Sequence, residues 1–212
     1  MNLRVTEIFF SIQGESNLVG LPTVFIRLTG CPLRCHFCDT SYAFSGGKLR
    51  SIDEILNEVN QFQAKHVTVT GGEPLAQKNC IDLLARLCDE AYVVSLETSG
   101  SVDITSVDKR VIKVMDVKTP GSGDENSNHY ANFELLSQSD QIKFVICDHN
   151  DYEWSKQVID KYDLTDCCEI LMSPIYQQLE PRFLAEWMLK DNLKARFQIQ
   201  LHKILWGDQA GK

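Results

Sequence analysis

Three cysteines within eight residues are the feature that most constrains this chain. Cys31, Cys35 and Cys38 lie in the run Gly-Cys-Pro-Leu-Arg-Cys-His-Phe-Cys-Asp-Thr of residues 30–40. Structural zinc sites and electron-transfer clusters usually take four protein ligands. The run holds no obvious fourth ligand, which indicates a metal cluster with one corner left for another molecule. The alternative is a chance grouping of reactive or zinc-binding thiols, for which His36 is the local candidate as a fourth ligand.

Length, charge and apolar content argue against several other classes of protein. A chain of 212 residues with 43% hydrophobic composition can bury a core, and we expect a single domain over residues 1–212. It has neither a long apolar segment nor a signal-like N-terminus, which predicts a cytoplasmic protein without a membrane contact. Thiols stay reduced there, which favours metal binding over disulfides. The net charge of −8 argues against nucleic acid and for a small-molecule substrate.

Apolar segments alternate with helical patterns, as is typical of a parallel α/β sheet. Strands are predicted at 24–28, 66–70, 92–96, 111–115, 141–146, 169–172 and 196–200, and helices at 52–59, 79–88, 151–162 and 182–190. Residues 120–130 are predicted to form one long polar loop. The remaining cysteines lie in apolar or amphipathic segments and are expected to be buried small hydrophobes: Cys80, Cys88, Cys147, Cys167 and Cys168.

Polar and glycine-containing motifs follow directly after these strands. Because ligands of α/β sheets and barrels bind at the carboxyl ends of the strands, we expect the motifs to form one site. Besides the cysteine run, they are Thr70–Pro74, Glu97–Gly100, Asp116–Lys118, Ser173–Ile175 and His202–Lys203.

The cysteine spacing and the segment Gly71-Gly72-Glu73-Pro74 together resemble the radical S-adenosylmethionine (SAM) enzymes. The resemblance implies an α/β fold, a partial (β/α) barrel of the radical SAM type with reduced helices. It also implies a [4Fe-4S] cluster on the three cysteines, with SAM on the fourth iron. Glycines expose backbone carbonyls and a carboxylate complements an ammonium, as contact with the amino group of SAM requires. Taken alone, the segment is an ordinary turn from a strand into a helix.

Within that family, residues 7–16, 20–22, 25–28 and 30–40 match a group of ring-contracting carbon–nitrogen lyases in order and spacing, and the match continues through 200–203. Such enzymes convert 6-carboxy-5,6,7,8-tetrahydropterin into 7-carboxy-7-deazaguanine with loss of ammonia, on the route to the modified tRNA base queuosine. The resemblance implies SAM contacts from Gly72, Glu73, Glu97, Asp116, Val117, Lys118 and Ser173, and substrate contacts from Ile12, Gln13, Gly14, Glu15, Arg27, Thr70 and His202. It assigns Mg2+ to Thr40 and no residue as a protein acid or base.

Alternatives remain for several of these residues. The amide and carboxylate of Gln13 and Glu15 suit the donor and acceptor edge of a pterin, but composition alone favours a solvated turn. Arg27 interrupts an apolar strand, and its partner is either a substrate carboxylate or an internal carboxylate. Thr40 is either a weak oxygen ligand or a helix cap. Asp116-Val117-Lys118 replaces the Ser-Pro-Lys type of segment found in relatives.

The resemblance further implies an electron donor such as flavodoxin or ferredoxin, and a homodimer. Two other functions stay open on the sequence. One is an activase of glycyl-radical enzymes, which acts on a protein partner, and the other is a structural zinc module. In some relatives the carboxylate at the end of the chain reaches the substrate. Whether the tail of residues 206–212 has the same role stays open on the sequence.

Overall fold

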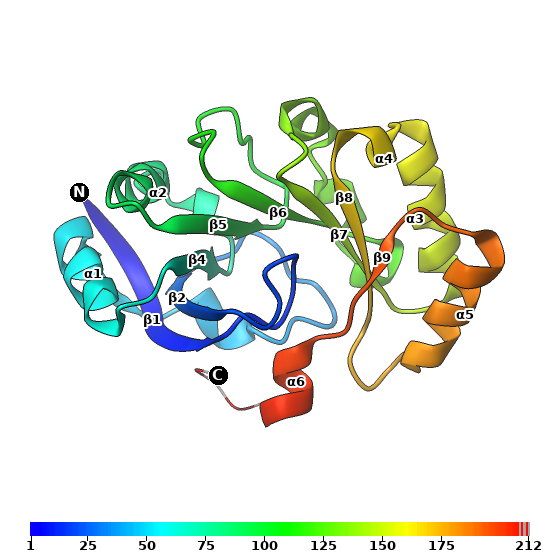
Figure 1. The fold of residues 1–212 in the computed structure, drawn as a ribbon, viewed down its shortest axis with the longest axis horizontal. Helices are drawn as coiled ribbons and strands as arrows, with labels where there is room; N and C mark the ends of the chain where they lie inside the picture. The colour runs from blue at the N-terminus through cyan, green and yellow to red at the C-terminus, as the bar shows by residue number, and fades with distance from the viewer. Residues whose placement is uncertain (208, 210, 212) are drawn as a thin grey trace.

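The computed structural model describes residues 1–207, 209 and 211, which contain one sheet in the strand order β3-β1-β2-β4-β5-β6-β7-β8-β9 (Figure 1). The strands are β1 (Asn2–Ile12), β2 (Pro22–Leu28), β3 (Lys48–Ser51), β4 (His66–Gly71), β5 (Val93–Thr98), β6 (Ile112–Val117), β7 (Gln141–Ile146), β8 (Glu169–Pro174) and β9 (Arg196–Phe197). The helices are α1 (Ile52–Val59), α2 (Cys80–Asp89), α3 (His149–Lys161), α4 (Leu164–Cys167), α5 (Pro181–Asp191) and α6 (Leu201–Trp206).

Neighbouring strands pair in parallel along β2-β4-β5-β6-β7-β8-β9, whereas β1 pairs antiparallel with both β2 and β3. Helices α1 to α5 lie around the outer side of the sheet, and α6 lies apart from them at the lower edge of Figure 1. This arrangement confirms the predicted partial barrel. The sequence prediction missed β1 and β3, and it extended the last strand to residue 200, where only Arg196–Phe197 is a strand.

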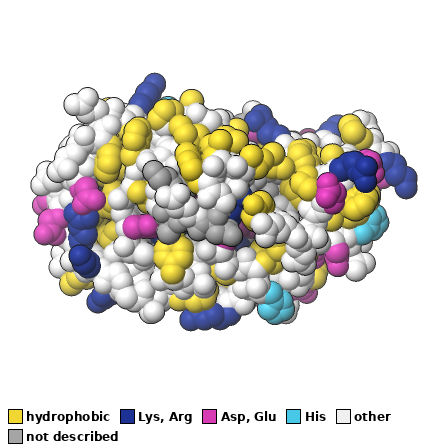
Figure 2. Space-filling model, turned by 90° about the horizontal axis from the view of Figure 1, so that it is seen from below, with side chains coloured by type: hydrophobic (Ala, Val, Ile, Leu, Met, Phe, Trp, Pro, Cys, Tyr) yellow, Lys and Arg dark blue, Asp and Glu magenta, His cyan; other side chains and the backbone are white. Residues whose placement is uncertain are grey.

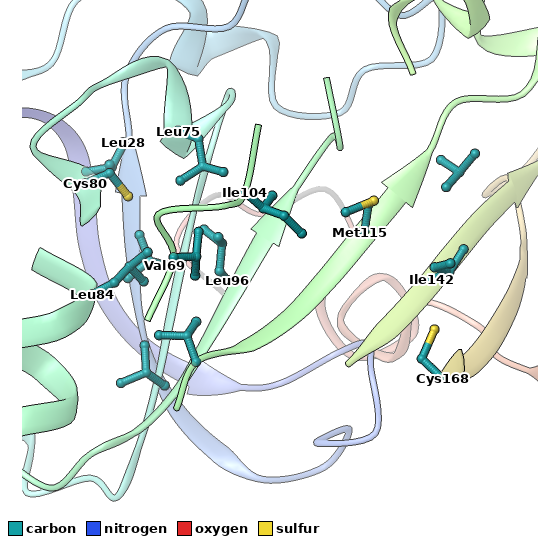
Figure 3. Packing of buried hydrophobic residues seen from close by; sticks show 14 of the residues in the cluster. Leu28, Val69, Leu75, Cys80, Leu84, Leu96, Ile104, Met115, Ile142 and Cys168 are labelled. Atoms are coloured by element: carbon teal, nitrogen blue, oxygen red, sulfur yellow. The ribbon is translucent and has the colours of Figure 1, made fainter. Parts of the chain in front are cut away.

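The hydrophobic core lies between the sheet and the outer helices. Figure 3 shows Val69 and Leu96, on neighbouring strands, beside Leu84 of α2. All three side chains are fully buried. Because side chains alternate along a strand, the residues before and after each core residue point to the inner face of the sheet.

Helix α1 begins with a capping box. The Ser51 hydroxyl accepts a hydrogen bond from the Glu54 amide, and the Glu54 carboxylate accepts one from the Ser51 amide. Of the five cysteines predicted to be buried, Cys80, Cys147 and Cys168 are buried, whereas Cys88 and Cys167 are half-buried. Among the described helices, none has the length and apolar character needed to cross a membrane.

Candidate active site

A cavity of about 590 Å³ opens at the carboxyl ends of the parallel strands. Its size lies within the range of small-molecule sites. It brings together most of the residues predicted from the sequence. Those lining it are Ile12, Gln13, Gly14, Glu15, Arg27, Cys31, Cys35, Cys38, Thr40, Thr70, Gly72, Glu97, Asp116, Lys118 and His202.

The inner face of the sheet carries a buried hydrogen-bond network centred on Gln13. The Gln13 amide nitrogen donates to Thr68 at 3.1 Å and to Glu97 at 3.2 Å, and the Thr70 hydroxyl donates to Glu97 at 3.0 Å. Gln13 is 2% exposed and Glu15 is 8% exposed. The solvated-turn alternative for these two residues is therefore wrong, because the loop after β1 turns inward over the open end of the sheet.

Four charged side chains of alternating sign line the same cavity. Lys143 Nζ lies 2.5 Å from Glu15 Oε2 and 3.5 Å from Asp116 Oδ2, and Lys118 Nζ lies 3.1 Å from the same Asp116 oxygen. Burial alone raises the pKa of Glu15, but the charges of Lys143 and His202 outweigh it and hold that pKa below its usual value. Glu15 is therefore a buried carboxylate that stays ionised.

Arg27 has an internal partner and also lines the cavity. Its Nε lies 2.7 Å from Glu7 Oε1, which confirms the alternative of an internal ion pair. That oxygen also accepts a hydrogen bond from the Tyr42 hydroxyl at 2.7 Å. Because this ion pair engages Nε, the terminal nitrogens of the guanidinium fork are the groups with which Arg27 can bind a carboxylate in the cavity.

The predicted polar loop supports the cysteine run. The backbone amide of Arg34 donates to Asp124 Oδ2 at 2.9 Å, and that of His36 donates to the Ser122 carbonyl at 2.9 Å. Burial raises the pKa of the Cys31 and Cys38 thiols, and that of Cys35 to about 12. Iron must therefore displace protons to bind here. Among the described residues, no three His, Cys, Asp or Glu side chains converge closely enough for one metal ion.

Gly72 lies against the cysteine run. A Cβ at this position would lie 2.0 Å from the Gly30 carbonyl oxygen and 2.8 Å from Cys31 Cβ, so only glycine fits. The next residue, Glu73, donates its backbone amide to the same Gly30 carbonyl at 2.8 Å. The turn after β4 is thus fixed against the first cysteine.

Glu73 does not line the cavity, in contrast to the expectation that its carboxylate meets SAM. The side chain is fully buried, and it accepts hydrogen bonds from the Leu75 amide, the Thr98 hydroxyl, and the amide and hydroxyl of Ser99. Protein donors already occupy its oxygens, so it fixes the turn after β4 to the end of β5. Val117 and Ser173 are also buried outside the lining.

Thr40 lies at the edge of the cavity, directly before a short 3-10 helix over Ser41–Phe44. Its hydroxyl donates to Asp39 at 2.8 Å and makes no capping hydrogen bond to that helix. The structure therefore does not support the helix-cap alternative.

Helix α6 covers the loop after β1. The Leu201 amide donates to the Gly14 carbonyl at 3.0 Å, and a Cβ on Gly14 would lie 2.1 Å from His202 Nδ1. His202 reaches the cavity through this close approach. The suggested role of the terminal carboxylate falls on Lys212, which lies outside the described residues.

Sequence reasoning missed two polar residues that face Glu15. Lys143 was assigned only to a strand, although a charge inside an apolar strand is the same signal that singled out Arg27. Gln200, whose amide nitrogen donates to Glu15 Oε1 at 2.7 Å, was predicted to end a strand but directly precedes α6.

Residues 25–162 match the model of the radical SAM superfamily. The 7-carboxy-7-deazaguanine synthase of Chlorobaculum tepidum is 46% identical over 211 residues, which cover 98% of this chain and 96% of that protein. The enzyme of the same name from Koribacter versatilis is 38% identical over 96% of this chain and 97% of its own. In fold, the chain resembles the crystal structure of QueE from Escherichia coli, with a TM-score of 0.75, 24% identity and 95% of each chain covered.

The chain belongs to the 7-carboxy-7-deazaguanine synthase family of radical SAM enzymes. Membership implies a [4Fe-4S] cluster and SAM, and it supports neither the activase nor the zinc module.

The residues present fit both groups that a 7-carboxy-7-deazaguanine synthase needs. Among the described residues, three cysteines and no fourth line the cavity, as suits a cluster that also binds SAM. Within the described residues, Asp116 Oδ1 is buried and has no hydrogen-bond partner, although its residue lines the cavity. A buried acceptor without a donor is costly, so this oxygen suits a ligand that brings a donor.

Proposed function

We propose that this cavity converts 6-carboxy-5,6,7,8-tetrahydropterin to 7-carboxy-7-deazaguanine with loss of ammonia, a step of 7-deazapurine and queuosine biosynthesis. The proposal rests on one observation. A single cavity joins the three-cysteine run to a buried amide, a buried carboxylate and an arginine, which together suit a carboxylated pterin.

The side near the cysteine run would hold the cofactors. Cys31, Cys35 and Cys38 are proposed to bind the cluster, and SAM is proposed to contact Gly72, Glu97, Asp116 and Lys118. When bound, the cluster and SAM supply a radical that removes hydrogen from the substrate carbon bearing the carboxylate. Glu73, Val117 and Ser173 are buried outside the cavity lining, so no contact with SAM is proposed for them.

The loop after β1 and the side chains next to it would hold the substrate. Gln13 and Glu15, with the backbone of Ile12 and Gly14, are proposed to bind the pyrimidine edge of the pterin, because the Glu15 carboxylate and the Gln13 amide oxygen can accept hydrogen bonds from its N–H donors. Arg27 is proposed to bind the carboxylate, and Thr70 and His202 complete the wall. The contribution of these residues is orientation and exclusion of water, for which no protein acid or base is needed.

The test of this function compares two substrates. The anaerobically reconstituted protein, with SAM and a reductant, should convert 6-carboxy-5,6,7,8-tetrahydropterin and leave tetrahydropterin without the carboxylate unchanged, as followed by mass spectrometry. Equal conversion of both pterins, or of neither, would contradict the proposal.

Arg27→Lys should reduce turnover strongly, because a bidentate guanidinium fork becomes a point charge. A loss of about tenfold or more is expected, since a hydrogen bond between charged groups contributes about 1.5–3 kcal/mol. The measurement is steady-state turnover, with iron content and SAM binding as controls that should stay unchanged. A protein that fails to fold would instead show that the ion pair with Glu7 is the main role of Arg27.

Mg2+ is proposed to bind Thr40 together with substrate oxygens. A lone hydroxyl is a weak ligand, so activity should rise with Mg2+ only when substrate is present. Thr40→Ser should keep this response, and Thr40→Val, which preserves the shape but removes the oxygen, should weaken it. Titration of turnover with Mg2+ measures the effect, and full turnover with an unchanged Mg2+ response in Thr40→Val would remove the metal assignment.

Two partners complete the proposal: a low-potential donor such as flavodoxin or ferredoxin, and a second copy of the chain. Figure 2 shows hydrophobic side chains spread across one face, with charged side chains mostly toward its ends. On α6, Ile204 is 61% exposed and Leu205 is 51% exposed. Burial of such apolar groups supports association of two copies.

A further inference from the structure

We propose that Lys143 is a positioning residue that makes the site selective for the 2-amino-4-oxo edge of the pterin, by holding Glu15 in place as a carboxylate. This inference rests on the proposed function, because it concerns the recognition of the substrate of that same site.

The geometry around Glu15 leaves room for two donors. Lys143 Nζ lies 2.5 Å from Oε2, and the Gln200 amide nitrogen donates to Oε1 at 2.7 Å. A carboxylate has about four acceptor positions, two on each oxygen. One position on each oxygen therefore remains, which matches the adjacent ring N–H and 2-amino group of a 2-amino-4-oxopyrimidine.

Lys143 is placed to keep this acceptor fixed. It projects from β7, whereas Glu15 lies in the loop after β1, so the ion pair spans the open end of the sheet. A second contact to Asp116, at 3.5 Å, holds the ammonium from β6. The side chains of Lys143 and Glu15 are only 12% and 11% exposed, so solvent screens the pair weakly.

The protonation of Glu15 depends on the groups that face it. These are Lys143 from β7, His202 from α6 and the neutral Gln200, while Lys143 in turn faces Asp116 and Glu97. Burial raises the pKa of Glu15, and Lys143 is the largest influence that lowers it. Without Lys143 the pKa of Glu15 rises, so Glu15 takes up a proton more readily as the pH falls. A protonated carboxyl presents a donor to the donors of the pterin, and binding weakens.

The experiment measures affinity in the holoenzyme by anaerobic calorimetry across weakly acidic to weakly alkaline pH. The probes are 6-carboxypterin and 6-carboxylumazine, whose 2-oxo group replaces the 2-amino donor. The wild type should prefer 6-carboxypterin. Lys143→Met should bind 6-carboxypterin at least about tenfold more weakly, lose most of the preference, and weaken further as the pH falls.

Three further variants separate positioning from a structural effect. Lys143→Arg keeps the cation and should restore most of the preference. Glu15→Gln keeps the shape without the charge, and should lose the preference with no dependence on pH. Lys156→Met removes another ion-paired lysine, on α3, and should behave as the wild type. Iron content and the urea midpoint check folding.

A Lys143→Met protein that keeps the preference, or weakens equally toward both probes without a pH effect, would overturn the inference. A Glu15→Gln protein that keeps the preference would also overturn it, even if Lys143→Met does not fold. A wild type that binds neither probe would instead contradict the proposed function, so the two failures are distinguishable.

Discussion

Alanine at Cys31, Cys35 or Cys38 should abolish turnover and remove the iron that the wild type binds, about four atoms for a complete cluster. Each thiol lines the cavity, and the run contains no fourth cysteine that could replace a lost one. The measurement is iron and sulfide content with the visible spectrum after anaerobic reconstitution. We expect brown wild-type protein and nearly colourless variants.

Cys88→Ala is the matched control for these variants. Cys88 is a half-buried free cysteine at the end of α2, outside the cavity lining. Its replacement should leave iron content and turnover unchanged. Colourless wild-type protein with one tightly bound zinc, or full iron in a cluster-cysteine variant, would contradict the assignment.

Gly72→Ala should abolish SAM binding and destabilise the fold. The added Cβ would lie 2.0 Å from the Gly30 carbonyl oxygen, and neither backbone can move without breaking the hydrogen bond from the Glu73 amide. Overpacking of this kind costs about 1–3 kcal/mol of stability, and here it also displaces Cys31. Calorimetry with SAM and urea unfolding measure the two effects.

Gly46→Ala is the control that separates the loss of stability from the loss of SAM binding. At Gly46 an added Cβ meets nothing within 4 Å, but φ is +81°, so alanine there brings backbone strain without a collision. It should lower stability and keep SAM binding. Normal SAM binding by Gly72→Ala would show that the contact between the turn after β4 and the cysteine run is dispensable.

The sequence predicted the parallel strands and the position of the site, because apolar segments mark the strands and the motifs follow their carboxyl ends. It could not predict β1, in which only Leu3 and Val5 of the first seven residues are well buried. That strand lacks a clear apolar alternation and is stabilised by its partners β2 and β3.

The directions in which individual side chains point also could not be predicted from the sequence. The motif places Glu73 at the right turn, yet the hydroxyls of Thr98 and Ser99, far along the chain, draw its carboxylate away from the cavity. Arg27 and Lys143 give the same signal in the sequence, a charge within an apolar strand. Only the fold shows that Lys143 meets Glu15, which is 128 residues away.

Product analysis of the wild type shows whether the cavity carries out the proposed ring contraction. Anaerobically reconstituted protein is incubated with 6-carboxy-5,6,7,8-tetrahydropterin, SAM and a reductant, and 7-carboxy-7-deazaguanine and ammonia are quantified together. Both products should form in equal amounts, and only with substrate and SAM present. Cleavage of SAM with the pterin recovered unchanged, or product without ammonia, would contradict it.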